Sequence, residues 1–105
     1  MDIQLSAVEA REIMPGYHGR MIHTQTMTLA FWEVEEGAVV PEHSHANEQV
    51  MHVLEGRFKL TVDGVAGIYE PGDLVVIGPH ISHGGMALSA CKLLDVFSPP
   101  REDYR

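Results

Sequence analysis

The sequence is poor in the residues that disulfide bonds and nucleic-acid surfaces require. It contains one cysteine, Cys91, so no disulfide can form within the chain, which is typical of a protein from a reducing compartment. Only seven lysines and arginines stand against 15 aspartates and glutamates, giving a net charge of −8. Nucleic acids and anionic membrane surfaces are bound by basic faces, so this balance excludes both as expected partners.

Long apolar runs are also missing. No stretch approaches the roughly 18 consecutive apolar residues of a membrane-spanning helix. The first residues lack the basic flank and the apolar stretch of a secretory signal, so we expect a cytoplasmic protein. A chain of 105 residues predicts one domain, and a homodimer that covers a sheet edge would suit so small a fold.

The chain does contain many strand and turn signals. Asp63-Gly64 predicts a type I′ hairpin, and turn signals recur about every ten residues between 37 and 80. Gly16–Gly19 is expected to be a loop, and the first dozen residues fit either a short strand or a helical turn. No window has a helical period, so the pattern predicts an all-β sandwich or barrel. The expected strands are β-branched and aromatic runs at 26–34, 49–54, 57–62, 65–69, 73–77 and 91–97.

Seven histidines are present, and the spacing of three of them suggests a metal site. His43 and His45 are separated by one residue, so on an extended strand both project from the same face. Gln49 has the same parity and shares that face if the strand continues. His83 would be a fourth ligand, from a neighbouring strand. Imidazole nitrogens with an amide oxygen suit one divalent transition metal, such as Ni, Zn, Fe, Mn or Co.

These four ligands are uncharged, which would leave the ion its full 2+ charge and make it a strong Lewis acid. Glu48 is the adjacent alternative to Gln49, but it points to the opposite face, and the spacing to Gly56 favours Gln49. His52 also has the opposite parity to Gln49, and His80 precedes His83 closely enough to border the site. The roles of Glu48, His52 and His80 stay open.

Two segments resemble the two motifs of the cupin superfamily. Residues 37–56, GAVVPEHSHANEQVMHVLEG, resemble the first motif, and residues 72–87, GDLVVIGPHISHGGMA, resemble the second. The sequence departs from the second motif at Gly78, where proline is usual, and at His80, where glycine or asparagine is common. The resemblance implies one cupin domain over residues 1–105, a jelly-roll β-barrel with the metal site within 37–87.

The C-terminal segment resembles a narrower group. Residues 93–104, LLDVFSPPREDY, are similar to the tail of the KdgF-type cupins, which linearise unsaturated uronates in pectin and alginate breakdown. In that family an aspartate at the position of Asp95 and an arginine at the position of Arg101 are functional. The resemblance therefore implies a metal-dependent sugar-acid isomerase with Asp95 and Arg101 as catalytic residues. Alternatively, Asp95 and Arg101 pair with each other, and the polar tail 98–105 locks a dimer.

Two other functions fit the same residues. A three-histidine site also serves metal-dependent dioxygenases that resemble quercetinases, and oxygen uptake would distinguish that activity. A non-catalytic cupin that binds a sugar or another small ligand would show saturable binding without product. The fold alone does not choose among these functions.

Overall fold

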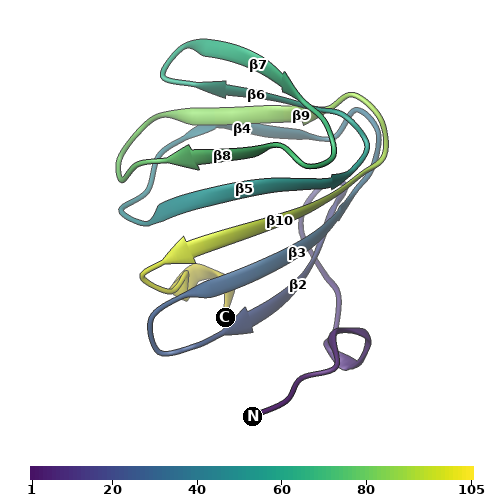
Figure 1. Ribbon diagram of the computed structural model, residues 1–105, viewed down its shortest axis with the longest axis vertical. Coiled ribbons are helices and arrows are strands. Elements are labelled where there is room, and N and C mark those ends of the chain that lie inside the picture. The colour runs from purple at the N-terminus through teal and green to yellow at the C-terminus, as the bar shows by residue number, and fades with distance from the viewer.

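The computed structural model describes all 105 residues as ten strands in two antiparallel sheets that pack face to face (Figure 1). One sheet has six strands in the order β1-β2-β3-β10-β5-β8, and the other has four in the order β4-β9-β6-β7. Neither of the two short 3₁₀ helices is long or apolar enough to cross a membrane. The elements are η1 (Leu5–Ala7), β1 (Arg11–Met14), β2 (Tyr17–His23), β3 (Thr28–Val34), β4 (Val39–His43), β5 (Glu48–Glu55), β6 (Phe58–Val62), β7 (Val65–Tyr69), β8 (Leu74–Ile77), β9 (His83–Ala87), β10 (Cys91–Ser98) and η2 (Glu102–Tyr104).

Side chains alternate between the interior and the exterior along the central strands. In β10 every second residue, from Cys91 to Phe97, is buried, and β3 alternates in the same way from Thr28 to Val34. Phe58 and Leu60 of the four-stranded sheet face these residues and complete the core. Sheets that bury one face against each other produce this period of two, so the predicted all-β jelly-roll barrel is confirmed.

The predicted hairpin at Asp63-Gly64 is confirmed as well. Asp63 has φ 49° and Gly64 has φ 79°, and a type I′ turn requires positive φ at both positions. The turn places Val62 opposite Val65 in the β6–β7 ladder.

The prediction of a loop at Gly16–Gly19 is wrong. Only Gly16 lies in a turn, with φ 81°, and β2 begins at Tyr17. Gly19 faces the ring of Trp32, where a Cβ atom would lie 2.7 Å from Cζ3. Gly19 therefore leaves space for the Trp32 ring inside the barrel. A glycine that is needed for packing cannot be distinguished, in the sequence alone, from a glycine that marks a loop.

Both ends of the chain are more ordered than their sequences indicate. The first dozen residues contain each of the two expected alternatives, a helical turn at η1 and then the strand β1. The segment after Ser98 is not a free polar tail, because Arg101 and Tyr104 are buried. The Arg101 amide donates to Thr28 Oγ1 at 2.9 Å, and the Arg11 guanidinium donates to the Tyr104 carbonyl. The segment thus folds back against β1 and β3.

Candidate metal centre

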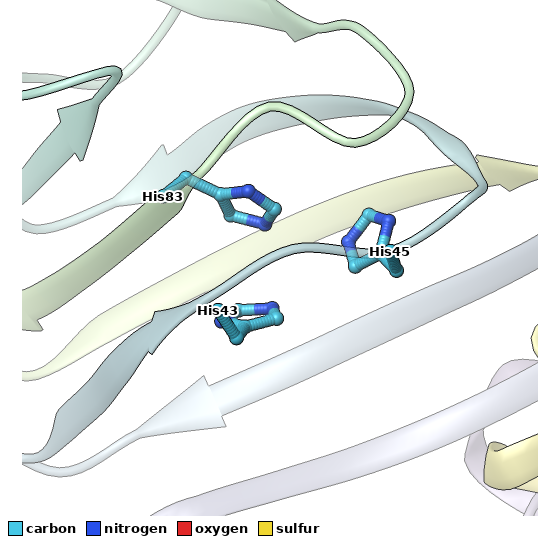
Figure 2. Close-up of side chains that lie close together, drawn as sticks. All are labelled: His43, His45 and His83. Carbon is cyan, nitrogen blue, oxygen red and sulfur yellow. The ribbon is translucent and has the colours of Figure 1, made fainter.

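Three histidine rings converge at one end of the barrel interior (Figure 2). One nitrogen from each of His43, His45 and His83 lies within 4.8 Å of the other two. His43 ends β4 and His83 begins β9, and the register of these antiparallel neighbours pairs the two residues directly. His45 lies in the segment that follows β4. The arrangement could hold a metal ion, since one donor atom from each ring is within reach of a common point.

Gln49 joins this cluster by a different route from the one its spacing predicted. The strand does not continue from His43 to Gln49, because β4 ends at His43 and β5 begins at Glu48. The two strands belong to different sheets, and residues 44–47 cross from one to the other. Gln49 therefore faces the histidines across the barrel, with its side chain buried, while Glu48 is exposed on the outside.

Main-chain carbonyls hold all three imidazoles in the same tautomer. Each Nδ1 atom lies at hydrogen-bond distance from a backbone oxygen, which can only accept, so Nδ1 carries the proton. The Nε2 atom of each ring then keeps the lone pair that a metal needs. The contacts are His43 to Pro41 O at 2.9 Å, His45 to Asn47 O at 2.9 Å and His83 to Ile81 O at 2.8 Å.

The surroundings of the rings fit a cation as well. His83 Nε2 is buried and has no hydrogen-bond partner in the protein, an arrangement that is costly unless another group binds there. Burial lowers the pKa of both His45 and His83, and the charge of Arg101 lowers the His45 value further. Both imidazoles are therefore held in the neutral form that coordinates metals.

The Gln49 amide is oriented by a buried carboxylate. Its Nε2 donates to Asp95 Oδ1 at 2.9 Å, so its Oε1 is directed toward His45 Nε2, 3.1 Å away. The other Asp95 oxygen accepts a hydrogen bond from Trp32 Nε1 at 3.0 Å. This bond was not predicted, because Trp32 lies 63 residues from Asp95 in the chain, and its only signal was that Trp32 faces inward on β3.

Asp95 is an acidic group in a largely apolar wall. It lies on β10 between Leu93 and Phe97, and all three face the interior because they have the same parity on the strand. Burial raises the pKa of Asp95 to about 6, although hydrogen bonds from Gln49 and Trp32 and the charge of Arg101 act in the opposite direction.

Arg101 pairs with Asp103 and not with Asp95. Its Nε and Nη2 atoms donate to the two Asp103 oxygens at 3.0 and 2.8 Å. The guanidinium carbon lies 4.7 Å from the centre of the Phe97 ring and 4.1 Å from that of Tyr104. Arg101 is only 7% exposed, and its Nη1 is buried without a partner. The Nη1 atom of this fixed guanidinium is therefore available to donate a hydrogen bond to another group.

The candidate residues share one cavity of about 50 Å³. His43, Gln49, His83, Asp95 and Arg101 all line it, together with core side chains from both sheets. The structure thus brings the proposed ligands together with the two residues expected to be catalytic. A cavity of this size holds an ion and one or two water-sized groups, so a larger molecule can insert only part of itself.

Asn47 connects the histidine segment to the C-terminal segment. Its main-chain carbonyl accepts a hydrogen bond from His45 Nδ1. Its side-chain nitrogen donates hydrogen bonds to the carbonyl oxygens of Pro99 at 2.5 Å and Pro100 at 3.4 Å. This link was not predicted, because an asparagine between two candidate ligands carries no signal of its partner across the fold.

His52 and His80 lie outside the cluster. His52 faces the exterior of β5, as its parity indicated. His80 is exposed and adopts φ 62°, a left-handed conformation that explains why glycine or asparagine is common there in similar motifs. Its amide donates to the His45 carbonyl at 2.7 Å, so the backbone of His80 fixes the loop beside the site.

Comparisons with known proteins agree with this architecture. The family model described as "Cupin domain" matches residues 30–97. The curated pectin degradation protein KdgF of Dickeya dadantii (strain 3937) is 31% identical over 71 residues. That match covers 66% of this chain and 64% of the relative, so the chain spans less than two thirds of the curated protein.

Two solved structures superpose on nearly the whole chain. KdgF from Halomonas sp. has a TM-score of 0.94 and 27% identity, covering 100% of this chain and 98% of its own. An RmlC-like cupin from Shewanella frigidimarina NCIMB 400 has a TM-score of 0.93 and 31% identity, covering 98% and 94%. The family match over residues 30–97 and these superpositions give the same answer: the chain belongs to the cupin family.

Proposed function

We propose that this cupin is a metal-dependent isomerase that converts unsaturated uronate monosaccharides into linear keto acids in pectin or alginate breakdown. The observation that carries the proposal is one cavity that combines an uncharged cluster of potential ligands with a buried carboxyl group and a buried guanidinium. The similarity to a pectin degradation protein supports the choice of substrate.

His43, His45, Gln49 and His83 would hold the metal. The partnerless His83 Nε2 and the amide oxygen of Gln49 fit an ion such as Ni, Zn, Fe, Mn or Co. When bound, the ion supplies a Lewis acid that stabilises negative charge on a substrate oxygen.

Arg101 would bind the substrate carboxylate. Its free Nη1 is a charged donor in a site from which water is largely excluded, where such hydrogen bonds are strong. The contacts with Asp103, Phe97 and Tyr104 hold the guanidinium plane in place. The small cavity admits the carboxylate end of the sugar, and the rest of the ring would lie at the mouth.

Asp95 would carry the proton. In the ring opening, the anomeric hydroxyl loses a proton, the bond from the anomeric carbon to the ring oxygen breaks, and the resulting enolate takes up a proton at carbon. The reaction is an isomerisation, so it needs no co-reactant. A positioned carboxylate that accepts and returns the proton is worth about 10²–10⁴ in rate. Gln49 and Trp32 hold the two Asp95 oxygens, so the substrate hydroxyl must replace one of these contacts.

The test is to incubate metal-loaded protein with 4,5-unsaturated galacturonate and follow the absorbance of the conjugated alkene. We expect the absorbance to fall well above the buffer rate, with no oxygen uptake at an electrode. Asp95→Asn should slow turnover by about 10²–10⁴-fold. It should retain metal, because asparagine keeps an acceptor for the Gln49 amide. Glu48→Gln removes the exposed acid next to Gln49 and is the matched control, which should stay active.

Three results would overturn the proposal. A wild-type rate equal to that of buffer would exclude the isomerase activity. Oxygen consumption would identify a dioxygenase instead. Full activity of the Asp95→Asn variant would remove Asp95 from the mechanism.

A further inference from the structure

Tyr104, near the end of the chain, places an aromatic ring in the site. Its main-chain carbonyl accepts a hydrogen bond from Arg11, and its amide donates to the Arg101 carbonyl at 3.1 Å. The ring lies edge-on to Trp32 and to Phe97, with ring centroids 5.8 Å apart in both cases, and only 9% of the residue is exposed. The main chain thus anchors Tyr104, while its side chain lines the cavity beside the two residues expected to be catalytic.

The hydroxyl group of Tyr104 forms no hydrogen bond with the protein, although both of its main-chain groups do. The Asp95 oxygens are already bound, one by Gln49 and the other by Trp32. The Arg101 guanidinium carbon lies 4.1 Å from the centre of the Tyr104 ring, but a guanidinium can only donate hydrogen bonds. The phenolic proton is therefore free. Since buried tyrosine hydroxyls usually have a partner, this free donor indicates a group that binds in the cavity.

Tyr17 provides a contrast, because it lines the same cavity. It is 2% exposed, and its ring also lies edge-on to Trp32, with the centroids 6.0 Å apart. The Tyr17 hydroxyl, however, donates to the Ala38 carbonyl at 3.0 Å. The two tyrosines thus share the cavity and one neighbouring ring, but only Tyr104 has a donor to offer to a bound molecule.

The surroundings of Tyr104 keep its hydroxyl protonated. Burial raises the pKa of Tyr104, the charge of Arg101 acts in the opposite direction, and the charge of Asp95 raises the pKa further. A neutral phenol in a site that excludes water can donate a hydrogen bond to an oxygen on which negative charge develops. Tyr104 is therefore suited to stabilise an oxyanion and not to act as a base.

The proposed ring opening produces such an oxyanion next to the substrate carboxylate. When the bond from the anomeric carbon to the ring oxygen breaks, its electron pair stays on the ring oxygen, which becomes the enolate oxygen. This oxygen and the carboxylate group are attached to the same carbon atom of the substrate. Arg101 would hold the carboxylate, and the Tyr104 ring packs against its guanidinium. A donor beside Arg101 therefore lies beside the oxygen that becomes charged.

We propose that Tyr104 is a further catalytic residue, whose hydroxyl donates a hydrogen bond to the ring oxygen of the substrate as that oxygen becomes the enolate oxygen. This role rests on the proposed function and adds one group to it. The proton of the anomeric hydroxyl still passes to Asp95 and returns to carbon, so Tyr104 keeps its own proton and no co-reactant is needed. The hydrogen bond is stronger in the transition state than in the ground state, because the charge on the oxygen grows as the ring opens.

The first measurement compares the steady-state kinetics of Tyr104→Phe and wild type, both loaded with metal, on 4,5-unsaturated galacturonate. Phenylalanine keeps the ring against Arg101 and removes only the hydroxyl. We expect kcat to fall roughly 10²–10³-fold, as when one oxyanion donor is removed. KM should change by less than about threefold, because the lost bond acts mainly in the transition state. Tyr17→Phe is the matched control and should keep its kcat, since the Tyr17 hydroxyl is bound to the main chain.

The second measurement does not require turnover. Oxalate carries a second negatively charged oxygen beside a carboxylate, as the enolate does, so calorimetric titration of the metal-loaded protein with oxalate probes the same donor. Tyr104→Phe should bind oxalate about 10- to 100-fold more weakly than the wild type. Its affinity for galacturonate, whose ring oxygen is uncharged, should be nearly unchanged. Tyr17→Phe should match the wild type with both ligands, and elemental analysis after the titration would confirm equal metal content.

The outcomes separate the role of Tyr104 from the proposed function. An active wild type whose kcat and oxalate affinity are both unchanged in Tyr104→Phe would overturn the role of Tyr104 alone. Equal losses of oxalate and galacturonate affinity would also overturn it, because the hydroxyl would then only hold Arg101 in place. An inactive wild type would exclude the isomerase activity. A selective loss of oxalate affinity would then still assign the hydroxyl as an anion donor, whereas an unchanged affinity would overturn both.

Discussion

The molecule contains two clusters of three side chains with metal-ligand chemistry, and they differ in almost every other respect. His43, His45 and His83 lie in the barrel interior, whereas Glu12, His18 and Glu35 gather on the surface near the start of β2. In both clusters the ligand atoms lie within 4.8 Å of one another. Proximity of suitable residues is therefore not what distinguishes the candidate metal centre from the surface ion pair.

The hydrogen-bond partners and the burial distinguish the two clusters. In the interior, main-chain carbonyls bind each Nδ1, and burial lowers the pKa of His45 and His83. On the surface, His18 Nε2 contacts Glu35 at 3.0 Å, and this hydrogen bond raises the pKa of His18. The rings of His45 and His83 are therefore held in the neutral form with an unused lone pair, while His18 is driven toward the charged form, which cannot coordinate a metal.

Removing one histidine from each cluster should give the largest contrast. His83→Ala deletes a buried potential ligand, so we expect metal affinity to fall by at least the roughly 100-fold that changes in the surrounding shell produce. His18→Ala makes the same replacement on the surface and should leave metal content unchanged. Elemental analysis after dialysis and calorimetric titration with Ni²⁺ or Zn²⁺ would measure both. Equal losses of metal in the two variants would contradict the proposed difference between the interior and the surface cluster.

Disturbing the support of the interior cluster should have the next largest effect. Trp32→Phe keeps an aromatic ring but removes the donor to Asp95, which in turn orients Gln49. We expect metal affinity to fall about 10- to 100-fold. The free energy of unfolding of the metal-free protein should fall by about 1–3 kcal/mol, because a buried Asp95 oxygen is left without a donor. Metal titration and urea unfolding in a chelator would measure these changes.

Tyr17→Phe is the control for this variant. The Tyr17 ring packs edge-on against Trp32, and its hydroxyl donates to the Ala38 carbonyl, away from Asp95. It should also destabilise the protein but leave metal affinity unchanged. If both variants weaken metal binding equally, the effect belongs to packing and not to the Asp95 hydrogen bond.

A smaller effect is expected when the link to the C-terminal segment is broken. Asn47→Ala removes the bonds to the Pro99 and Pro100 carbonyls but keeps the main-chain carbonyl that orients His45. We expect a loss of about 1 kcal/mol in stability, faster hydrogen exchange at the Arg101 amide and unchanged metal affinity. Unchanged exchange at this amide would show that the other contacts of the segment suffice.

The smallest effect concerns the surface cluster. Because its contact with Glu35 raises the pKa of His18 above 6.5, the protonated form is favoured in the folded state. This contribution to stability is fully present below the unfolded-state pKa and is lost as the pH rises through the folded-state value. Glu35→Gln should move the pKa of His18 downward in an NMR titration. A pKa that does not respond would exclude Glu35 as the cause.

The sequence predicted more of the fold than of the site. The strands from 49 to 77 and the hairpin at Asp63-Gly64 follow from local patterns, and the structure contains them. The prediction failed at Gly16–Gly19, where a glycine serves a distant tryptophan. It also treated residues 98–105 as a polar tail, although Arg101 and Tyr104 are buried there. In both places the deciding contacts are made with residues that are distant in the chain.

Within the site, the spacing in the sequence identified the residues that converge, but they converge for a different reason from the one that the spacing suggested. His43 and Gln49 meet because the chain crosses between two sheets, not because one strand continues. No local pattern could show that Asp95 would hold Gln49 through one oxygen and Trp32 through the other, or that Arg101 would pair with Asp103.

The sequence by itself determined the period of two along the strands, the positions of the turns and the His-x-His spacing, because each depends on residues that are neighbours in the chain. Only the tertiary structure decided which sheet each strand joined and which side chains met inside the barrel. The contacts from Asp95 to Gln49 and Trp32 span 46 and 63 residues of chain. Such contacts form only when β3, β10 and β5, which are far apart in the chain, pair side by side in one sheet.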